Sequence, residues 1–186
     1  MNIKNLNNIK MVVLDVDGVL TDGSIYVDGK GEIFKQFDAK DGLGIQVLKT
    51  HDILTGIISG KSSQALDYRC NQLGFDEIIT GCKNKLPELE RICIKHQIEL
   101  SDVAYCGDDI IDVAIMKKVG LAVCPVDGHP LAQKEADWII DKPGGHGMVR
   151  TFIDKLIMEQ KGCSLEEVYE PIFKLIESDN LSKVKQ

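Results

Sequence analysis

An apolar run that ends in two carboxylates is the feature that most constrains this chain. Met11–Leu14 contains no polar residue, and Asp15 and Asp17 follow it one residue apart, just before Gly18. Such a run is typical of a strand that is buried on both faces of a sheet. Ligands of open α/β sheets bind where the strands end, and a glycine there lets the backbone turn close to a ligand. A carboxylate there can act as a nucleophile, and its neighbour can serve as acid and base.

Taken alone, this stretch fits an ordinary turn rich in Asp and Gly equally well. Later in the chain, polar side chains end apolar runs or begin a helical pattern: Ser59, Lys85 and the group Asp108, Asp109 and Asp112. A hydroxyl, a lysine and a carboxylate cluster are the groups that hold a phosphoryl group beside a hard cation. Each has an ordinary alternative, as a helix cap, a solvated lysine or an acidic first turn. Their order favours the functional interpretation.

Short apolar runs and helix-like segments alternate along the chain. Strands are expected at residues 11–14 and near residues 53, 77, 103 and 121, and helices at residues 43–50, 62–73, 86–96 and 110–119. This order predicts an α/β fold with a doubly wound, mostly parallel, Rossmann-like sheet. Residues 24–27 and 32–37 flank a Gly-rich turn, which predicts a small β-hairpin insertion.

The sequence near the C-terminus predicts a separate helix. Ser164 and Glu167 have the spacing of a capping box, which predicts a helix over residues 164–174. We expect residues 178–186 to be mobile. For a chain of 186 residues, these patterns indicate one domain over residues 1–160 and a helical C-terminal tail over residues 161–186.

In order and spacing, the polar segments resemble the motifs of the haloacid dehalogenase superfamily of phosphatases. The resemblance rests on VLDVDGVLTDG, IYVDGKGEIFKQFDAKDGLGI, YCGDDIIDVAIMKKVGLAV and HPLAQKEADWI, and it spans residues 9–156. The short intervals between Asp17 and Ser59 and between Lys85 and Asp108 leave no room for a cap domain. The resemblance therefore implies a phosphatase domain of the capless kind over residues 1–160.

The resemblance also implies roles for the catalytic residues. Asp15 would attack phosphorus, and Asp17 would protonate the leaving oxygen and then activate the water that cleaves the aspartyl-phosphate. Ser59 would bind the phosphoryl oxygens, and Lys85 would balance charge between Asp15 and the phosphate. An oxygen-only site with few carboxylates favours Mg²⁺. The family pattern gives the metal the carboxylates of Asp15 and Asp108 and the backbone carbonyl of Asp17.

Two acidic residues are left for supporting roles, and the sequence does not choose between them. Asp109 or Asp112 would stand behind the metal ligands or orient Lys85. The substrate-binding positions that the resemblance implies, besides Asp17 and Lys85, are Asp38, Ala39, Lys40, Asp41, Gly42, Gln46, Lys61 and Arg69. Arg69 suits a bidentate grip on a carboxylate, although a solvated helix face is its ordinary alternative.

These residues leave three candidate functions. The resemblance implies hydrolysis of 3-deoxy-D-manno-octulosonate 8-phosphate, a phosphorylated sugar acid of lipopolysaccharide biosynthesis. A nonulosonate 9-phosphate is the second candidate, and the positive charge of Lys61 favours the first. Gln46, Lys61 and His146 stand where many relatives are expected to carry arginine. A non-catalytic scaffold is the third candidate, and the intact acidic motifs speak against it.

Assembly and location follow from the missing cap and from composition. A site without a cap needs closure by a neighbouring subunit, and Ile25, Val27, Ile33 and Phe37 give the hairpin an apolar surface. The resemblance implies a homotetramer built around these hairpins. A net charge of −7 argues against nucleic-acid binding. Six cysteines without CxxC spacing, a polar N-terminus and no long apolar segment predict a cytoplasmic protein without a membrane partner.

Overall fold

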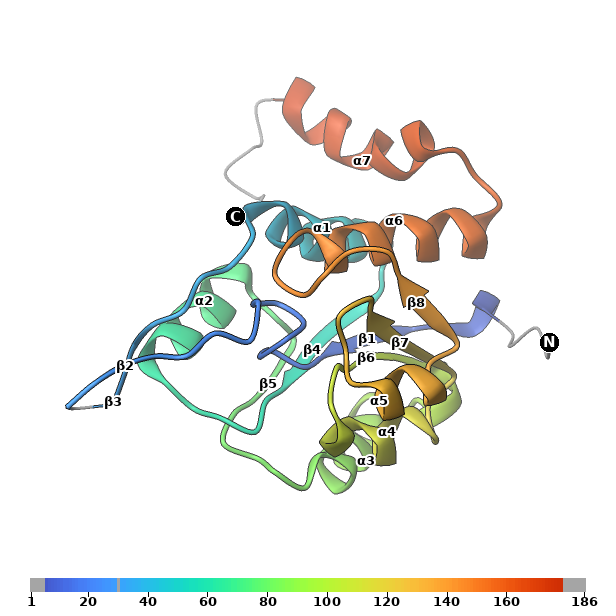
Figure 1. Cartoon of the computed structure of the whole chain (residues 1–186). Coiled ribbons are helices and arrows are strands. Elements are labelled where there is room, and N and C mark those ends of the chain that lie inside the picture. Colours follow the sequence, from blue (N-terminus) through green and yellow to red (C-terminus); the bar gives the residue numbers. More distant parts are fainter. Residues whose placement is uncertain (1–5, 30, 179–186) are drawn as a thin grey trace.

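The computed structural model describes residues 6–29 and 31–178, and in these residues six parallel strands form the central sheet (Figure 1). The strand order is β5-β4-β1-β6-β7-β8. The strands are β1 Met11–Leu14, β4 Leu54–Ile58, β5 Glu77–Ile79, β6 Val103–Cys106, β7 Leu121–Pro125 and β8 Trp138–Ile140. The order steps outward from β1 in both directions, which confirms the doubly wound, Rossmann-like fold.

Helices cover both faces of the sheet (Figure 1). The helices are α1 Ala39–Thr50, α2 Gln64–Leu73, α3 Lys85–His96, α4 Val113–Met116, α5 Pro130–Glu135, α6 Met148–Lys161 and α7 Leu165–Glu177. Short 3₁₀ turns are η1 Leu6–Asn8, η2 Leu100–Asp102 and η3 Ile110–Asp112. Every residue of β1 is buried, because alternate side chains enter two separate cores. This explains why the run lacks the polar alternation of a half-exposed strand.

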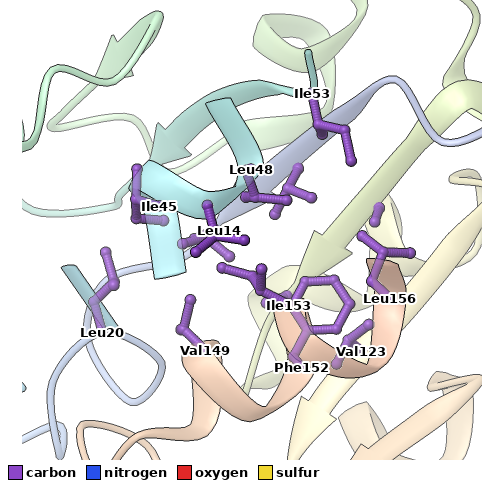
Figure 2. Close-up of a cluster of buried hydrophobic side chains, with 14 of the residues drawn as sticks. Leu14, Leu20, Ile45, Leu48, Ile53, Val123, Val149, Phe152, Ile153 and Leu156 are labelled. Carbon is purple, nitrogen blue, oxygen red and sulfur yellow. The ribbon is translucent and has the colours of Figure 1, made fainter. Parts of the chain in front are cut away.

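The larger core lies between the sheet and helices α1 and α6. Leu14 and Val123 point from the sheet toward Ile45, Leu48 and a row of α6 side chains that includes Phe152 and Leu156 (Figure 2). The smaller core packs Met11 and Val13 against α3, α4 and α5. Two clusters of buried hydrophobic side chains hold β1 in place. They therefore also fix the position of the residues that follow β1.

The predicted tail helix is confirmed at α7. The Ser164 side chain accepts a hydrogen bond from the Glu167 backbone, and the Glu167 carboxylate accepts one from the Ser164 backbone. Val168, Tyr169 and Ile172 are buried where α7 packs on α1 and α6. Apart from Ser178, the segment that we expect to be mobile lies outside the described residues.

Several boundaries differ from the sequence predictions. The hairpin strands β2 Tyr26–Asp28 and β3 Gly31–Phe34 lie closer to the turn than predicted, and residue 30 in that turn is outside the described residues. In place of the helix predicted at residues 110–119, the chain forms η3 and the four-residue α4. Aspartate capping tightens its start into a 3₁₀ turn. Strand β8 and helices α5 and α6 were not predicted. The described residues contain no cap domain, as expected.

Candidate active site

The functional side chains meet because β4, β1 and β6 are neighbours in the sheet. Asp15 follows β1, Ser59 follows β4, and Asp108 follows β6 after one glycine. Parallel strands end at the same edge, so residues far apart in sequence converge there. A cavity of about 280 Å³ opens at this edge. Its lining residues are Asp15, Asp17, Gly23, Gly60, Lys61, Asp108, Asp109 and Ile111.

A buried lysine lies directly beneath the cavity. Lys85 begins α3, and its Nζ lies 2.8 Å from Oδ1 of Asp15 and 2.7 Å from Oδ1 of Asp112. It also donates a hydrogen bond of 3.3 Å to the Tyr105 hydroxyl, which itself donates to Oδ1 of Asp112. Burial opposes the charged form of Lys85, but the two carboxylates outweigh it and raise the pKa of the amine. Lys85 therefore stays a cation against the nucleophile candidate.

Asp112 is the residue that orients Lys85, and Asp109 caps a turn instead. Oδ1 of Asp112 faces Lys85, while its Oδ2 accepts hydrogen bonds from the backbone N–H groups of Asp108 and Asp109 at 3.1 and 3.2 Å. Asp109 accepts a hydrogen bond from the Ile110 backbone at 2.7 Å. Both carboxylate oxygens of Asp112 are thus already engaged. Of the two residues that the sequence left open, Asp112 lies behind the lysine.

The geometry of the acidic cluster leaves two carboxylates for a cation. Carboxylate oxygens of Asp15, Asp108 and Asp112 lie within 4.8 Å of one another. Because Asp112 is engaged by protein donors, Asp15 and Asp108 are the carboxylates that can bind a metal ion. Asp108 comes so close to the backbone of Gly18 that a Cβ there would lie 2.1 Å from its Oδ2. With a φ of +85°, position 18 also favours glycine by conformation.

The close packing of these acidic residues raises the pKa values of both Asp15 and Asp108. Burial and the nearby Asp112 raise the pKa of Asp15 to about 7, although Lys85 works in the opposite direction. Burial and repulsion from Asp15 and Asp112 raise the pKa of Asp108 to about 7. These two carboxyl groups resist being ionised at the same time. A divalent cation between them would stabilise their ionised forms.

Asp17 is held by a residue that the sequence analysis missed. Lys35, just after β3, lies with its Nζ 2.5 Å from Oδ1 of Asp17 and 3.0 Å from Oε2 of Glu32. Burial would lower the pKa of Lys35, but hydrogen bonds to Asp17 and Glu32 raise it above its usual value. Lys35 lies 18 positions from Asp17. Its place within the predicted hairpin strand is a weak signal, since nothing local marks which way the hairpin folds.

Ser59 is buried where β4 ends. Its Oγ accepts a hydrogen bond from the Lys61 backbone at 3.2 Å, and its own N–H donates to the Ile79 carbonyl. Lys61 itself is exposed and lines the cavity. The Ser59 hydroxyl still has a proton to donate, because its hydrogen bond with Lys61 uses it as an acceptor.

The remaining substrate-binding candidates lie in α1, at its start and in α2, outside the cavity lining. Asp38 caps α1 by accepting from the Lys40 backbone, and Ala39 and Lys40 are exposed. Asp41 is buried and accepts from the Arg150 backbone at 2.8 Å. Burial raises the pKa of Asp41 to about 6, against hydrogen bonds from the α6 backbone.

The other three candidates of this group, Gly42, Gln46 and Arg69, lie where α1 meets α2. Gln46 is buried and donates to the Leu73 carbonyl at 3.0 Å. The Arg69 guanidinium lies 6.0 Å from the centre of the Phe37 ring, and a Cβ at Gly42 would lie 2.8 Å from its Nη2. The structure therefore brings Arg69 to the segment at residues 38–42, and it turns the Gln46 amide into a contact between helices.

The glycine-rich loop before α6 packs on the turn that carries Asp17. A Cβ at Gly144 would lie 1.9 Å from the carbonyl oxygen of Gly18. The N–H of Gly145 donates to the Val19 carbonyl at 3.0 Å. His146 hydrogen-bonds through Nδ1 to the Gly144 carbonyl at 2.7 Å, which stabilises its own loop. The two glycines thus let one backbone segment support another beneath the site.

Comparison with known proteins identifies the family of this chain. Residues 57–152 match the model of a family of haloacid dehalogenase-like hydrolases. The chain is 42% identical over 158 residues to the 3-deoxy-D-manno-octulosonate 8-phosphate phosphatase of Escherichia coli (strain K12), covering 85% of this chain and 84% of that protein. The chain therefore belongs to the haloacid dehalogenase-like hydrolases.

Solved structures show the same fold. The phosphatase of that name from Yersinia pestis superposes with a TM-score of 0.81 at 38% identity, covering 84% of this chain and 85% of that one. The Moraxella catarrhalis phosphatase, solved with magnesium, phosphate and KDO, has a TM-score of 0.81 at 37% identity, covering 84% and 90% of the two chains. Separately, none of the helices in the described residues has the length and apolar character to span a membrane.

The pKa values of the acidic cluster predict how a divalent metal stabilises the protein. Asp15 and Asp108 have pKa values of about 7 when folded and an ordinary value of 3.8. Between these pH values the folded protein holds more protons than the unfolded chain, so metal-free protein loses stability as pH rises. Mg²⁺ requires the ionised carboxylates, so its stabilising effect should grow over the same range.

We expect the rise in Tm caused by Mg²⁺ to be larger near about pH 7.5 than near about pH 5.5. Thermal unfolding followed by circular dichroism measures it. Asp108→Asn should remove most of the rise, whereas Asp141→Asn, at an exposed position, should keep it. An equal rise at both pH values, or one that survives in Asp108→Asn, would contradict the metal assignment.

Proposed function

We propose that this protein is a Mg²⁺-dependent phosphatase that converts 3-deoxy-D-manno-octulosonate 8-phosphate to the free sugar acid and phosphate. This places it in lipopolysaccharide biosynthesis. The observation that carries the proposal is the convergence of Asp15, Asp17 and Asp108 around one cavity, above the buried Lys85 and beside Gly60 and Lys61, which directly follow the buried Ser59. Similarity over most of the chain to phosphatases that bear this substrate's name supports the choice of substrate.

In the proposed reaction, Asp15 attacks phosphorus and forms an aspartyl-phosphate. Asp17 gives a proton to the leaving sugar oxygen, and then takes one from the water that cleaves the aspartyl-phosphate. The Ser59 hydroxyl and nearby backbone N–H groups bind the phosphoryl oxygens. Lys85 holds Asp15 in place and balances the added charge, because it is fixed from behind by Asp112.

The carboxylates of Asp15 and Asp108 and the backbone carbonyl of Asp17 would hold the Mg²⁺. The oxygen-only donor set and the raised pKa values of the two carboxyl groups fit a hard divalent cation. When bound, the ion would neutralise negative charge on the phosphoryl oxygens.

The proposed substrate carries a carboxylate at the end remote from its phosphate, and two cations suit it. Lys61 lies on the cavity wall, and Arg69 lies beside the segment at residues 38–42. Nε of Arg69 is buried without a hydrogen-bond partner within the described residues, so this guanidinium has capacity for an acidic ligand. A phosphatase for a nonulosonate 9-phosphate remains the alternative, and the positive charge of Lys61 argues for the sugar acid named above.

We propose that residues 1–160 form the phosphatase domain and residues 161–186 a helical extension. We also propose a cytoplasmic location, because the six cysteines are free thiols that suit a reducing compartment. The exposed side chains of the hairpin, Ile25, Val27, Ile33 and Phe34, support assembly into a homotetramer. Phe37, which the sequence analysis grouped with them, packs against the protein's own core instead.

The catalytic proposal predicts that Asp15→Asn abolishes phosphate release while the protein stays folded. Asparagine keeps the shape of the side chain but cannot form the aspartyl-phosphate. The assay measures phosphate release from 3-deoxy-D-manno-octulosonate 8-phosphate with Mg²⁺, and circular dichroism checks the fold. Asp141→Asn, at an exposed position, is the control. Near wild-type turnover by folded Asp15→Asn would refute the mechanism, and wild-type protein inactive on this ester would refute the substrate.

The substrate proposal predicts a selective effect at Arg69. Arg69→Ala should lower kcat/KM for 3-deoxy-D-manno-octulosonate 8-phosphate by about tenfold or more, since a charged hydrogen bond contributes ~1.5–3 kcal/mol. It should scarcely change the hydrolysis of p-nitrophenyl phosphate, which has no carboxylate. Arg91→Ala, on the exposed face of α3, serves as the matched control. Equal losses on both esters would assign Arg69 to the structure rather than to the sugar acid.

The assembly proposal predicts that a charge on the hairpin surface dissociates the protein. Val27→Lys, at a side chain that is 63% exposed, should shift the mass measured by light scattering from a tetramer toward smaller species and lower activity with it. Val126→Lys, at an exposed position outside the hairpin, is the control. A wild-type protein that is active as a monomer at assay concentration would overturn the assembly proposal.

A further inference from the structure

The hairpin reaches the active site through a lysine that the proposed reaction leaves unused. Lys35 follows β3, and its side chain is only 1% exposed. Its ammonium lies between two carboxylates, Oδ1 of Asp17 and Oε2 of Glu32. Lysine usually extends its charged end into water, so an ammonium enclosed by two carboxylates is held in one place.

We propose that Lys35 is a positioning residue, which orients the carboxyl group of Asp17 for proton transfer to the leaving oxygen. The inference rests on the proposed phosphatase function. Because Lys35 engages Oδ1, the other oxygen, Oδ2, stays available for the proton transfer. As Asp15 bonds to phosphorus, the electrons of the breaking P–O bond stay on the leaving oxygen, and the proton of Asp17 moves to it. The carboxylate that remains lies beside the ammonium, which stabilises the charge as it develops.

Glu32 gives this arrangement its second contact. It lies three residues before Lys35, inside β3, and holds the ammonium from the hairpin side. Without Glu32, Lys35 would keep one carboxylate partner but lose the contact that ties its position to the strand. Replacing Glu32 should therefore cause a weaker form of the same defect as replacing Lys35.

A purely structural role for Lys35 makes a different prediction. If Lys35 only fastens the hairpin to the protein, its loss should disturb the hydrolysis of all esters alike. If it positions Asp17, the loss should be largest for esters whose leaving oxygen must be protonated as the bond breaks. Benzyl phosphate and p-nitrophenyl phosphate separate these cases, because both carry one ring and no carboxylate, but the nitrophenolate leaves without help from an acid.

The experiment measures kcat/KM for both esters with Mg²⁺ in wild-type protein, Lys35→Met, Lys35→Arg and Glu32→Gln. This ratio reports the steps up to phosphorylation of Asp15, so the later hydrolysis of the aspartyl-phosphate does not enter. We expect Lys35→Met to lose about tenfold or more on benzyl phosphate relative to p-nitrophenyl phosphate, because an acid catalyst contributes ~10²–10⁴ in rate. Lys35→Arg should restore much of this selective loss, and Glu32→Gln should show a smaller one.

Lys118→Met, which removes the same charge at an exposed position, should leave both ratios unchanged. Equal losses on the two esters in folded Lys35→Met would overturn the positioning role while leaving the phosphatase proposal intact. Wild-type protein that hydrolyses neither ester would instead overturn the phosphatase proposal itself. If Lys35→Met fails to fold, Glu32→Gln decides: a selective loss on benzyl phosphate supports the inference and no selectivity overturns it.

Discussion

The buried ammonium of Lys85 is the interaction on which the whole site depends. It lies between Asp15 and Asp112, in contact with the hydroxyl of the fully buried Tyr105. A cation this deep is tolerated only because two carboxylates and a hydroxyl replace its water. The arrangement requires the ends of β1 and β6 and the start of α3 to meet within hydrogen-bonding distance. The parallel sheet and its two apolar cores supply that rigidity.

Two positive groups divide the acidic residues into separate functions. Lys85 lies between Asp15 and Asp112, while Lys35 holds Asp17. Within the described residues Asp108 makes no salt bridge, and burial and repulsion from Asp15 raise its pKa. The carboxylates therefore differ by environment, although they are the same residue type. A single edge of a sheet can in this way offer a nucleophile, an acid and a metal ligand.

The sequence was informative where a local pattern determines the structure. The mainly apolar runs of β1, β4 and β6 and the capping box of α7 each carry their own signal, and all are present. β8 is too short and too exposed for its pattern to be recognised. The sequence could not show whether Asp109 or Asp112 orients Lys85, because both positions suit the start of a helix. Only burial in the folded protein distinguishes the two residues. Lys35 was missed because its contact with Asp17 depends on which way the hairpin folds.

The hairpin combines two kinds of contact within a few residues. Ile33 turns outward, whereas Glu32 beside it turns inward to meet Lys35 and, through it, Asp17. A ribbon of two strands has little stability by itself and needs contacts on its faces. The ion pairs supply one such contact inside each subunit, and the proposed assembly would supply the other. A neighbour bound to the exposed apolar side chains of the hairpin would then hold the strand that positions Lys35, so that assembly and proton transfer at Asp17 become physically linked.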